Sequence, residues 1–228
     1  MAGVAALPAA ALTDLVGVAS GYRPGADEAR ALPVAPALSP LLPGGGLRRG
    51  STVAVASGTA LLMALLAETS RRGSWCAVVG VPAFGAVAAA ELGIALDRLA
   101  LVPRPGPDWP EVVAALIDGV DVVAVAVPDA APPALARRLA ARARQRGCVL
   151  VPYGRWDGAD LTLRMTDGVW QGLGQGRGRL CRRRMAVAAR GRGAAARPRE
   201  VTVWLPGDTG ALAPFDRATV RDLPRAPR

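Results

Sequence analysis

Five short apolar runs alternate with helix-prone stretches between residues 51 and 152, and this alternation constrains the fold more than any other feature of the chain. The runs occupy residues 51–56, 75–81, 98–102, 120–127 and 148–152, and helices are expected at 60–70, 84–92, 109–117 and 133–146. Because neighbouring positions in each run are apolar, such strands would be buried on both faces of a sheet. The sequence therefore predicts an α/β fold in which helices cover both faces of a mostly parallel sheet.

The pattern changes after residue 153, where the helix-prone stretches stop. Runs at 160–164, 178–187 and 201–205 are separated by Gly-rich segments, which predicts an antiparallel extension of the sheet. The glycines at alternate positions from Gly172 to Gly178 superficially match a dinucleotide-binding fingerprint. They precede Arg-rich residues rather than an apolar helix, so we interpret them as a flexible hairpin connection.

Both ends of the chain are expected to lie outside this core. The sequence divides into an N-terminal helix near 7–18 with a Pro-rich linker (1–40), the core (41–205) and a disordered tail (206–228). Some apolar residues of the tail are spaced so that a short helix could form on docking to a partner. These candidate partner-binding residues are Leu212, Phe215, Val220 and Leu223.

The chain contains no Lys, His or Asn, and its 28 basic residues are all Arg. Without His there is no Ser-His or Cys-His pair and no imidazole metal ligand, and without Lys there is no Schiff base and no P-loop ammonium group. The three cysteines form no CxxC pair, so no zinc site is expected. Residues 50–67 are uncharged but divide into a strand and a helix, so we expect no membrane span and a cytoplasmic location.

Several segments, taken in order, resemble the core of RecA-type ATPases. Residues 43–50 (PGGGLRRG) are similar to the Gly-Gly-Leu-x-x-Gly lead-in of those proteins. Residues 91–99 resemble the passage after their second strand, 120–123 the start of the Walker B strand, and 182–205 the strand pair near the end of the core. The resemblance covers about residues 40–208 and implies a RecA-like, P-loop NTPase-type fold with a degenerate nucleotide site.

The departures from the RecA pattern fall at the positions that carry chemistry. A Walker A loop needs a Lys that reaches the phosphates and a hydroxyl that holds Mg²⁺, whereas the corresponding Ser57-Gly58-Thr59 stretch is shorter and has no Lys. The catalytic carboxylate position falls in 80–82 (GVP), and the Walker B aspartate position is Ala126. We therefore expect no ATPase activity, no catalytic residue and no cofactor. Ser57-Gly58-Thr59 is interpreted as a strand-to-helix turn with a hydroxyl cap, and weak phosphate binding at the helix start is the alternative.

A RecA-like core without its ATPase residues and without the two long DNA-binding loops of RecA resembles one group of proteins. These are the RecA-like accessory proteins of the actinobacterial inducible mutagenesis system, the ImuA-prime family. That family is expressed on DNA damage and works beside a catalytically inactive Y-family polymerase homologue and an error-prone replicative-type polymerase. The resemblance implies a non-enzymatic adaptor in mutagenic translesion synthesis, with these two polymerases as partners and association with the nucleoid after damage.

The net charge of +10 is concentrated in one segment near the end of the core. Nine Arg and no acidic residue lie between positions 171 and 199, and they are the candidate DNA-binding residues: Arg177, Arg179, Arg182, Arg183, Arg184, Arg190, Arg192, Arg197 and Arg199. An Arg cluster would bind DNA phosphates in a salt-dependent manner, and the alternative is a solvated pair of antiparallel strands. Two other functions stay open, a DNA-binding protein that acts through residues 177–199 and a regulator that binds ATP without hydrolysing it.

Overall fold

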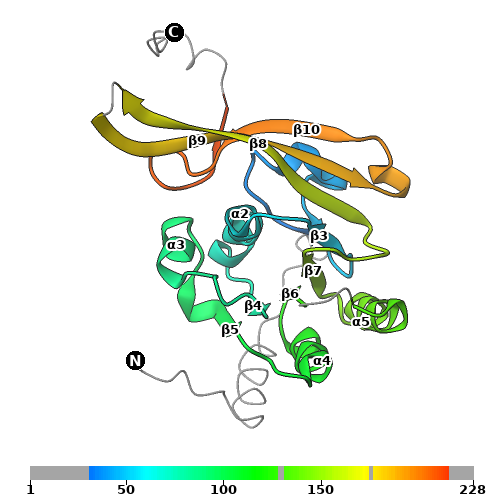
Figure 1. Ribbon diagram of the computed structural model, residues 1–228. Coiled ribbons are helices and arrows are strands. Elements are labelled where there is room, and N and C mark those ends of the chain that lie inside the picture. Colours follow the sequence, from blue (N-terminus) through cyan, green and yellow to red (C-terminus); the bar gives the residue numbers. More distant parts are fainter. Residues whose placement is uncertain (1–30, 128–130, 175–176, 216–228) are drawn as a thin grey trace, which may run out of the picture.

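The computed structural model describes residues 31–127, 131–174 and 177–215. In these residues nine strands form one sheet in the order β11-β10-β9-β8-β3-β7-β6-β4-β5 (Figure 1). Neighbouring strands are parallel from β8 to β5, and β9, β10 and β11 are antiparallel to their neighbours. The strands are β3 (Val53–Val55), β4 (Cys76–Val79), β5 (Leu99–Val102), β6 (Val122–Ala126), β7 (Val149–Tyr153), β8 (Leu161–Gly174), β9 (Arg177–Gly191), β10 (Arg199–Trp204) and β11 (Ala213–Pro214). The predicted α/β fold with an antiparallel extension is confirmed.

Helices cover both faces of the parallel part of the sheet. The helices α2 (Thr59–Arg71) and α3 (Ala86–Glu91) pack on one face, and α4 (Trp109–Gly119) and α5 (Pro133–Arg146) pack on the other. In β6, Val122 and Ala124 belong to the first core, whereas Val123 and Val125 belong to the second. Successive side chains of a strand point to opposite faces, so a strand covered on both sides is apolar at every position.

Residues 31–40 belong to the folded core, which corrects the expectation that the linker extends to residue 40. The strands β1 (Ala31–Leu32) and β2 (Leu47–Arg48) pair in an antiparallel manner, and the 3-10 helices η1 (Ser39–Leu41) and η2 (Pro43–Gly45) lie between them. Leu32 and Leu38 are buried in the same core as α2. The Thr69 hydroxyl of α2 donates a hydrogen bond to the carbonyl of Pro33. The prolines shape a compact segment here, and the helix expected near 7–18 lies outside the described residues.

The glycines at 172–178 lie in a long β-hairpin formed by β8 and β9, which confirms the hairpin connection predicted from the sequence. β8 pairs with β9 from Leu161 as far as Gly174, which faces Arg177, and its first residues also pair with β3. Gly172 lies at a register shift with φ of 119°, and a Cβ there would be 2.0 Å from the carbonyl oxygen of Arg179. Glycine is therefore required for the bulge in the strand. The two residues that join the strands, 175 and 176, lie outside the described residues.

Residues 206–215 are part of the fold, which corrects the expectation of a disordered tail from residue 206. β11 pairs with the end of β10, and the amide of Gly207 donates a hydrogen bond of 2.8 Å to the carbonyl of Ala211. The Phe215 ring lies 5.5 Å from the Trp204 ring, measured between centroids. These residues are ordered because an aromatic side chain of β10 gives them an apolar surface to cover.

Candidate functional site

The degenerate phosphate loop lies at the carboxyl end of β3, where ligands bind in open α/β sheets. Only Ala56, Ser57 and Gly58 separate β3 from α2. The amide of Ala56 donates to the carbonyl of Leu163 (2.8 Å), and the amide of Gly154 donates to the carbonyl of Val55 (2.9 Å). The loop is therefore held closely between its neighbouring strands β8 and β7.

A side chain of β8 lies close to this loop. Gly58 has φ of 89°, and a Cβ on it would be 2.4 Å from Cε and 2.8 Å from Sδ of Met165. A Walker A loop encloses phosphate with its backbone amides, whereas this shorter loop has a thioether beside its glycine. Met165 itself is half-buried and packs against the core beneath α2.

The hydroxyl groups of the loop do not cap α2, which corrects the expected hydroxyl cap. The N-cap residue is Gly58, and no side chain bonds to the first turn there. The hydroxyl of Thr59 instead lies 3.2 Å from the hydroxyl of Tyr153, at the end of β7. Ser57 is exposed. The helix begins at Thr59 because glycine can adopt the positive φ that the turn needs.

The two positions where an ATPase would carry carboxylates are occupied by backbone in close contact. Gly80 follows β4 with φ of 73°, and a Cβ there would be 2.2 Å from the carbonyl oxygen of Ala126. Ala126 ends β6 and pairs with Tyr153 of β7. Of the residues 80–82 in which the carboxylate position falls, residue 80 could not carry a carboxylate side chain without a collision with the neighbouring strand end.

The nine arginines of the basic segment do not form one patch. Arg177 and Arg190 lie on the same strand, β9, and are roughly 40 Å apart at about 3.3 Å per residue. The exposed members form two groups, one near the hairpin end and one near the turn into β10: Arg177 and Arg179, and Arg190, Arg192, Arg197 and Arg199. The other three, Arg182 to Arg184, are half-buried between these groups. The nine arginines are therefore close in the sequence but not in space.

The three central arginines contact aromatic rings of the chain itself. The guanidinium carbon of Arg182 lies 4.2 Å from the centre of the Trp204 ring, and Arg182 also bonds to Asp208 and Gln171 at 3.0 Å. Arg184 lies over Phe215 (5.6 Å) and Arg183 over Trp170 (5.8 Å). Arginine stems cover apolar surface while the charge stays near a π face. The triplet thus contributes to packing, and DNA contact through it stays a prediction.

The candidate partner-binding residues of the tail divide between the fold and the undescribed end. Leu212 packs against the core, and Phe215 packs between Trp204 and Arg184, so both bind within the chain rather than projecting from it. This corrects their interpretation as anchors of a tail helix. Val220 and Leu223 lie outside the described residues.

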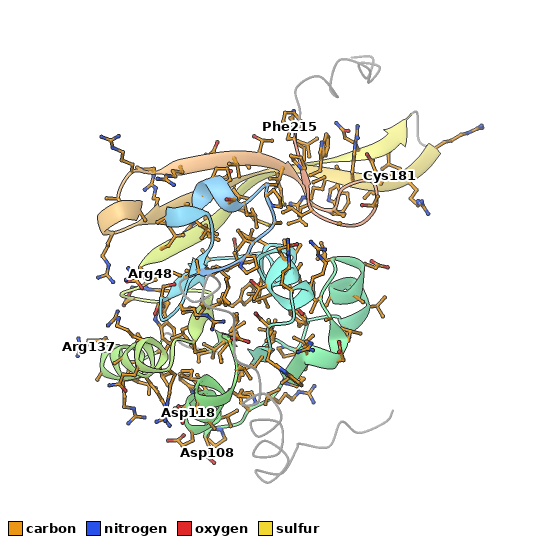
Figure 2. The ribbon with its side chains drawn as sticks, turned by 180° about the vertical axis from the view of Figure 1, so that it is seen from behind. Arg48, Asp108, Asp118, Arg137, Cys181 and Phe215 are labelled. Atoms are coloured by element: carbon orange, nitrogen blue, oxygen red, sulfur yellow. The ribbon has the colours of Figure 1, made fainter. Side chains whose placement is uncertain are left out.

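A different surface, which the sequence did not reveal, exposes apolar side chains. We name residues 168–174 and 177–183 the distal ribbon; it projects past α3 and carries Cys181 (Figures 1 and 2). Among the described residues six large apolar side chains are exposed, and four of them are in this ribbon: Val169, Trp170, Leu173 and Leu180. The sequence does place Trp170, Leu173 and Leu180 beside the glycines. Single apolar residues in such a segment do not predict a surface, because isolated exposed apolar residues are common.

Both edges of the distal ribbon are largely without a strand partner in the described part of the chain. β3 pairs with β8 only through Leu161–Leu163, and β10 pairs with β9 only as far as Arg184. Beyond these positions the ribbon makes two further backbone bonds on its β10 side, between Arg183 and residues 205 and 206. An open strand edge with apolar side chains is a template for another chain.

Two of the three thiols, those of Cys76 and Cys148, are buried. Burial raises the pKa of the Cys76 and Cys148 thiols, so both stay protonated at neutral pH. No group of three or more Cys, Asp or Glu side chains that could hold a metal ion occurs in the ranges that the structure describes. Within those same ranges, no helix is long and apolar enough to cross a membrane.

Comparison with known proteins places this geometry in context. The fold is similar to the crystal structure of the RadB recombinase, with a TM-score of 0.58, 14% sequence identity, and coverage of 79% of this chain and 97% of that one. At this identity the likeness establishes the RecA-like fold alone. An uncharacterised protein of Mycobacterium tuberculosis strain H37Rv, Rv3395c, is 43% identical over 124 residues. The matched region is 54% of each chain, so this chain spans about half the length of that relative in the match.

The family comparison covers the region that contains the degenerate loop, the helix-covered strands and α5. Residues 40–158 match the model of the MT3502 N-terminal domain, which is slightly more than half of the 228 residues. The match ends before β8, so the family description rests on the parallel part of the sheet rather than on the ribbon. The chain belongs to the MT3502 N-terminal domain family.

Proposed function

We propose that this chain is a non-enzymatic RecA-like adaptor in a DNA-damage-induced mutagenic translesion synthesis complex. Its partners would be an inactive Y-family polymerase homologue and an error-prone replicative-type polymerase, as the resemblance to the ImuA-prime family implies. The protein would then act in the cytoplasm and associate with the nucleoid after damage. The RecA-like fold and the membership of the MT3502 N-terminal domain family support the coarser part of this proposal.

The observation that carries the adaptor role is the distal ribbon. It offers two open edges and exposed apolar side chains, among them Leu173 at 61% and Trp170 at 44% exposure. A partner strand that adds to an open edge gains main-chain hydrogen bonds, and adjacent apolar side chains give the contact its specificity. Exposed apolar side chains beside an open strand edge are typical of interaction sites.

The degenerate loop supports the non-enzymatic part of the proposal. Lys is absent from the whole chain, Met165 lies against Gly58, and Gly80 contacts the backbone of Ala126. These three features act independently against phosphate binding, metal binding and activation of water. They also speak against a regulator that binds ATP at this loop.

Crosslinked purification of the tagged full-length chain from DNA-damaged cells tests the proposal. We expect mass spectrometry to identify both polymerase-type partners with the wild-type chain. A ribbon variant that carries Leu173→Asp and Leu180→Asp should lose at least one of them, since charge on the ribbon opposes apolar contact. Val87→Asp is the matched control, because Val87 is 74% exposed on α3 and is not part of the ribbon.

The outcomes separate the parts of the proposal. Recovery of neither polymerase with the wild-type chain contradicts the adaptor role. Recovery of both at wild-type levels with the ribbon variant contradicts the ribbon as the contact. Loss of partners with Val87→Asp as well would indicate a general effect of surface charge, and circular dichroism of each variant shows whether the fold is retained.

DNA binding is the second candidate function, and one feature of the ribbon favours it. Arg177 and Arg179 are exposed on the strand that faces Trp170 and Leu173. Single-stranded DNA binders combine cationic side chains for phosphates with aromatic rings on which bases stack. Gel-shift titration at two salt concentrations should therefore give weaker binding for Arg177→Ala with Arg179→Ala than for wild type.

The control for this titration is the pair Arg137→Ala and Arg138→Ala, which removes two exposed charges from α5. Equal losses in the two double variants would indicate unspecific attraction to net charge and would contradict a ribbon-specific site. Replacing Arg182 to Arg184 is a poorer test, because those side chains pack on aromatic rings and their loss would disturb the fold.

A further inference from the structure

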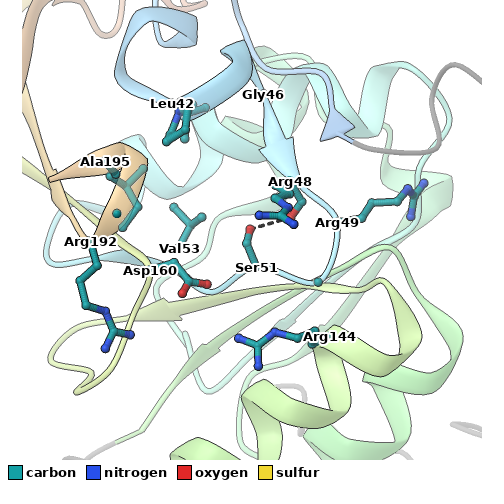
Figure 3. A pocket seen from close by; sticks show the side chains of 14 residues that line it. Leu42, Gly46, Arg48, Arg49, Ser51, Val53, Arg144, Asp160, Arg192 and Ala195 are labelled. Carbon is teal, nitrogen blue, oxygen red and sulfur yellow. Dashed lines mark hydrogen bonds between the residues drawn. The ribbon is translucent and has the colours of Figure 1, made fainter. Parts of the chain in front are cut away.

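A pocket of about 360 Å³ lies at the amino ends of β3 and β8. The degenerate phosphate loop lies at the opposite, carboxyl end of β3. Its lining comes from η2, the β2–β3 turn, α5, the start of β8, and the end of β9 with η4 (Figure 3). The volume falls in the lower part of the range of small-molecule sites, roughly 300–1,000 Å³. The pocket belongs to neither the phosphate loop nor the distal ribbon.

Four arginines line this pocket, and three of them, which come from separate elements, have no carboxylate partner in the described part of the chain. They are Arg48 of β2, Arg144 of α5, and Arg192 just after β9, and each is exposed. Among the described residues no acidic oxygen lies within ion-pair distance of any of the three. The neighbouring Arg49 differs, because it pairs with Asp121 at 2.8 Å and turns away from the pocket (Figure 3).

The backbone around these arginines is tightly fixed. Gly50 approaches α5 so closely that a Cβ on it would be 3.0 Å from the Cα of Arg144. The Ser51 hydroxyl donates to the carbonyl of Arg48 at 2.6 Å, and the amide of Arg192 donates to the carbonyl of Asp160 at 3.0 Å. The three guanidinium groups are therefore attached to positions that are held in place before any ligand binds, which lowers the entropic cost of binding.

The chemistry of the lining selects the ligand. Three arginines against the one carboxylate of Asp160 leave two uncompensated positive charges, and the guanidinium fork suits phosphate oxygens. A water molecule takes only about 30 Å³. An ion of the size of phosphate would therefore fill only a small part of the pocket. Apolar side chains of Leu42, Val53 and Leu161 form another wall. The Asp160 carboxylate already accepts the amide of Thr52 at 2.9 Å and retains capacity to accept from a ligand hydroxyl.

We propose that this pocket binds a free sugar phosphate such as a mononucleotide, whose sugar keeps a hydroxyl group. The arginines hold the phosphate, Asp160 accepts a sugar hydroxyl, and the apolar wall packs against the rest of the ligand. This inference does not depend on the adaptor role, because it rests on a different part of the molecule.

Isothermal titration of the full-length chain at low salt tests the pocket. A deoxynucleoside 5′-monophosphate should bind saturably, at least about tenfold more tightly than inorganic phosphate and than the unphosphorylated nucleoside, since each lacks one half of the contacts. No saturable binding at 10 mM ligand, or equal affinity for inorganic phosphate, overturns the proposal. A 5′-phosphorylated DNA oligonucleotide, whose 5′-terminal sugar has no free hydroxyl, should bind more weakly than the mononucleotide, and equal or tighter binding would contradict the hydroxyl contact to Asp160.

Charge-reversal variants locate the binding. Arg144→Glu should weaken binding of the monophosphate by about tenfold or more, as expected for loss of a charge-assisted contact. Arg137→Glu is the matched control, because Arg137 is exposed on the same helix and lies outside the pocket lining (Figure 2). Equal losses in both variants overturn the assignment to this pocket. Asp160→Asn keeps an acceptor for the Thr52 amide and should selectively reduce the preference for sugar phosphate over inorganic phosphate; an unchanged preference removes Asp160 from the proposed contacts.

Discussion

The helix-covered half of the sheet, β3 to β7 with α2 to α5, and the antiparallel half, β9 to β11 with the distal part of β8, share one aliphatic core that includes Val187 and Val203, but the antiparallel half adds contacts between arginine and aromatic side chains. In the first half the strands are apolar on both faces, and burial keeps thiols such as Cys76 protonated. In the second half a buried tryptophan, Trp204, is covered by the guanidinium of Arg182 and the ring of Phe215. One hydrogen-bonded sheet thus adds a layer of arginine and aromatic side chains to its aliphatic core.

This difference indicates how the chain divides its tasks. The helix-covered half has the RecA-like fold, and Met165 and the carbonyl of Ala126 lie close to Gly58 and Gly80 at the carboxyl ends of β3 and β4. The antiparallel half exposes the apolar and cationic groups that a partner could bind. We expect substitutions in the first half to affect mainly stability and those on the ribbon to affect mainly binding.

The largest effect is expected in the helix-covered half. Leu65 of α2 is fully buried, and Leu65→Ala should lower the free energy of unfolding by about 4 kcal/mol, because it removes buried methyl groups and leaves a cavity. Urea unfolding followed by circular dichroism measures this. Leu96→Ala is the control, since Leu96 is 46% exposed, and its effect should stay within about 0.5 kcal/mol. A loss below about 1 kcal/mol for Leu65→Ala contradicts burial as the main source of stability in this half.

The second effect measures the arginine and aromatic layer. Trp204 is 4% exposed, and Trp204→Ala should cost about 3 kcal/mol, near the lower end for buried aromatic residues. Trp170→Ala removes the same type of side chain from the ribbon, where it is 44% exposed, and should cost less than about 1 kcal/mol. If both substitutions lower the free energy of unfolding by similar amounts, the exposed fraction does not distinguish a tryptophan that stabilises the fold from one that is free to bind a partner.

The helix-covered half was also the half that the sequence predicted well. The run at 120–127 corresponds to β6 at Val122–Ala126, and the helix expected at 133–146 corresponds to α5 at Pro133–Arg146. A strand buried on both faces carries its signal locally, in a continuous apolar run. The same reasoning placed the degenerate loop correctly at the carboxyl end of β3, because a glycine and small residues follow that run directly.

The antiparallel half and the pocket depend on residues that are distant in the sequence. Arg182 packs on Trp204, which is 22 positions away, and nothing in the triplet of arginines indicates that an aromatic partner exists. Likewise Arg48, Arg144 and Arg192 meet only because β2, α5 and the end of β9 adjoin the same strand ends. Proline-rich residues 31–40 matched the composition of a linker, although Leu32 and Leu38 are buried. Composition describes such segments poorly when a few apolar residues determine their packing.

The loop after β3 lies close to β8 at Gly58, next to Met165. Gly58→Ala places a Cβ at a positive φ and next to Cε of Met165, so it should cost about 2 kcal/mol through backbone strain and crowding. In a Met165→Ala background the crowding is absent, and the cost of Gly58→Ala should fall by about 0.5–1 kcal/mol. Thermal or urea unfolding of the four proteins in this cycle gives the coupling energy. A coupling of zero would contradict the placement of Met165 against the loop.

The smallest effect tests whether charge contributes to the half that burial dominates. Asp118 at the end of α4 pairs with Arg142 and Arg146 of α5, with a distance of 3.1 Å to Nε of Arg146. The hydrogen bond from Arg142 lowers the pKa of Asp118, against the opposing effect of partial burial. Asp118 should therefore stabilise the fold above its unfolded pKa of about 3.9, and this contribution should be lost as the pH falls through the lower folded pKa.

The variant Asp118→Asn removes the charge but keeps an oxygen that can accept from Arg142. At pH 7 it should lower the free energy of unfolding by less than about 1 kcal/mol, as is usual for exposed ion pairs. The difference from wild type should shrink when urea unfolding is repeated at successive pH values below 4, because the wild-type carboxylate then becomes protonated as well. A difference that stays constant down to pH 2 would show that the substitution acts through packing or hydrogen bonding. In that case the charge of Asp118 would not contribute to stability, and the contrast between the two halves would sharpen at this ion pair.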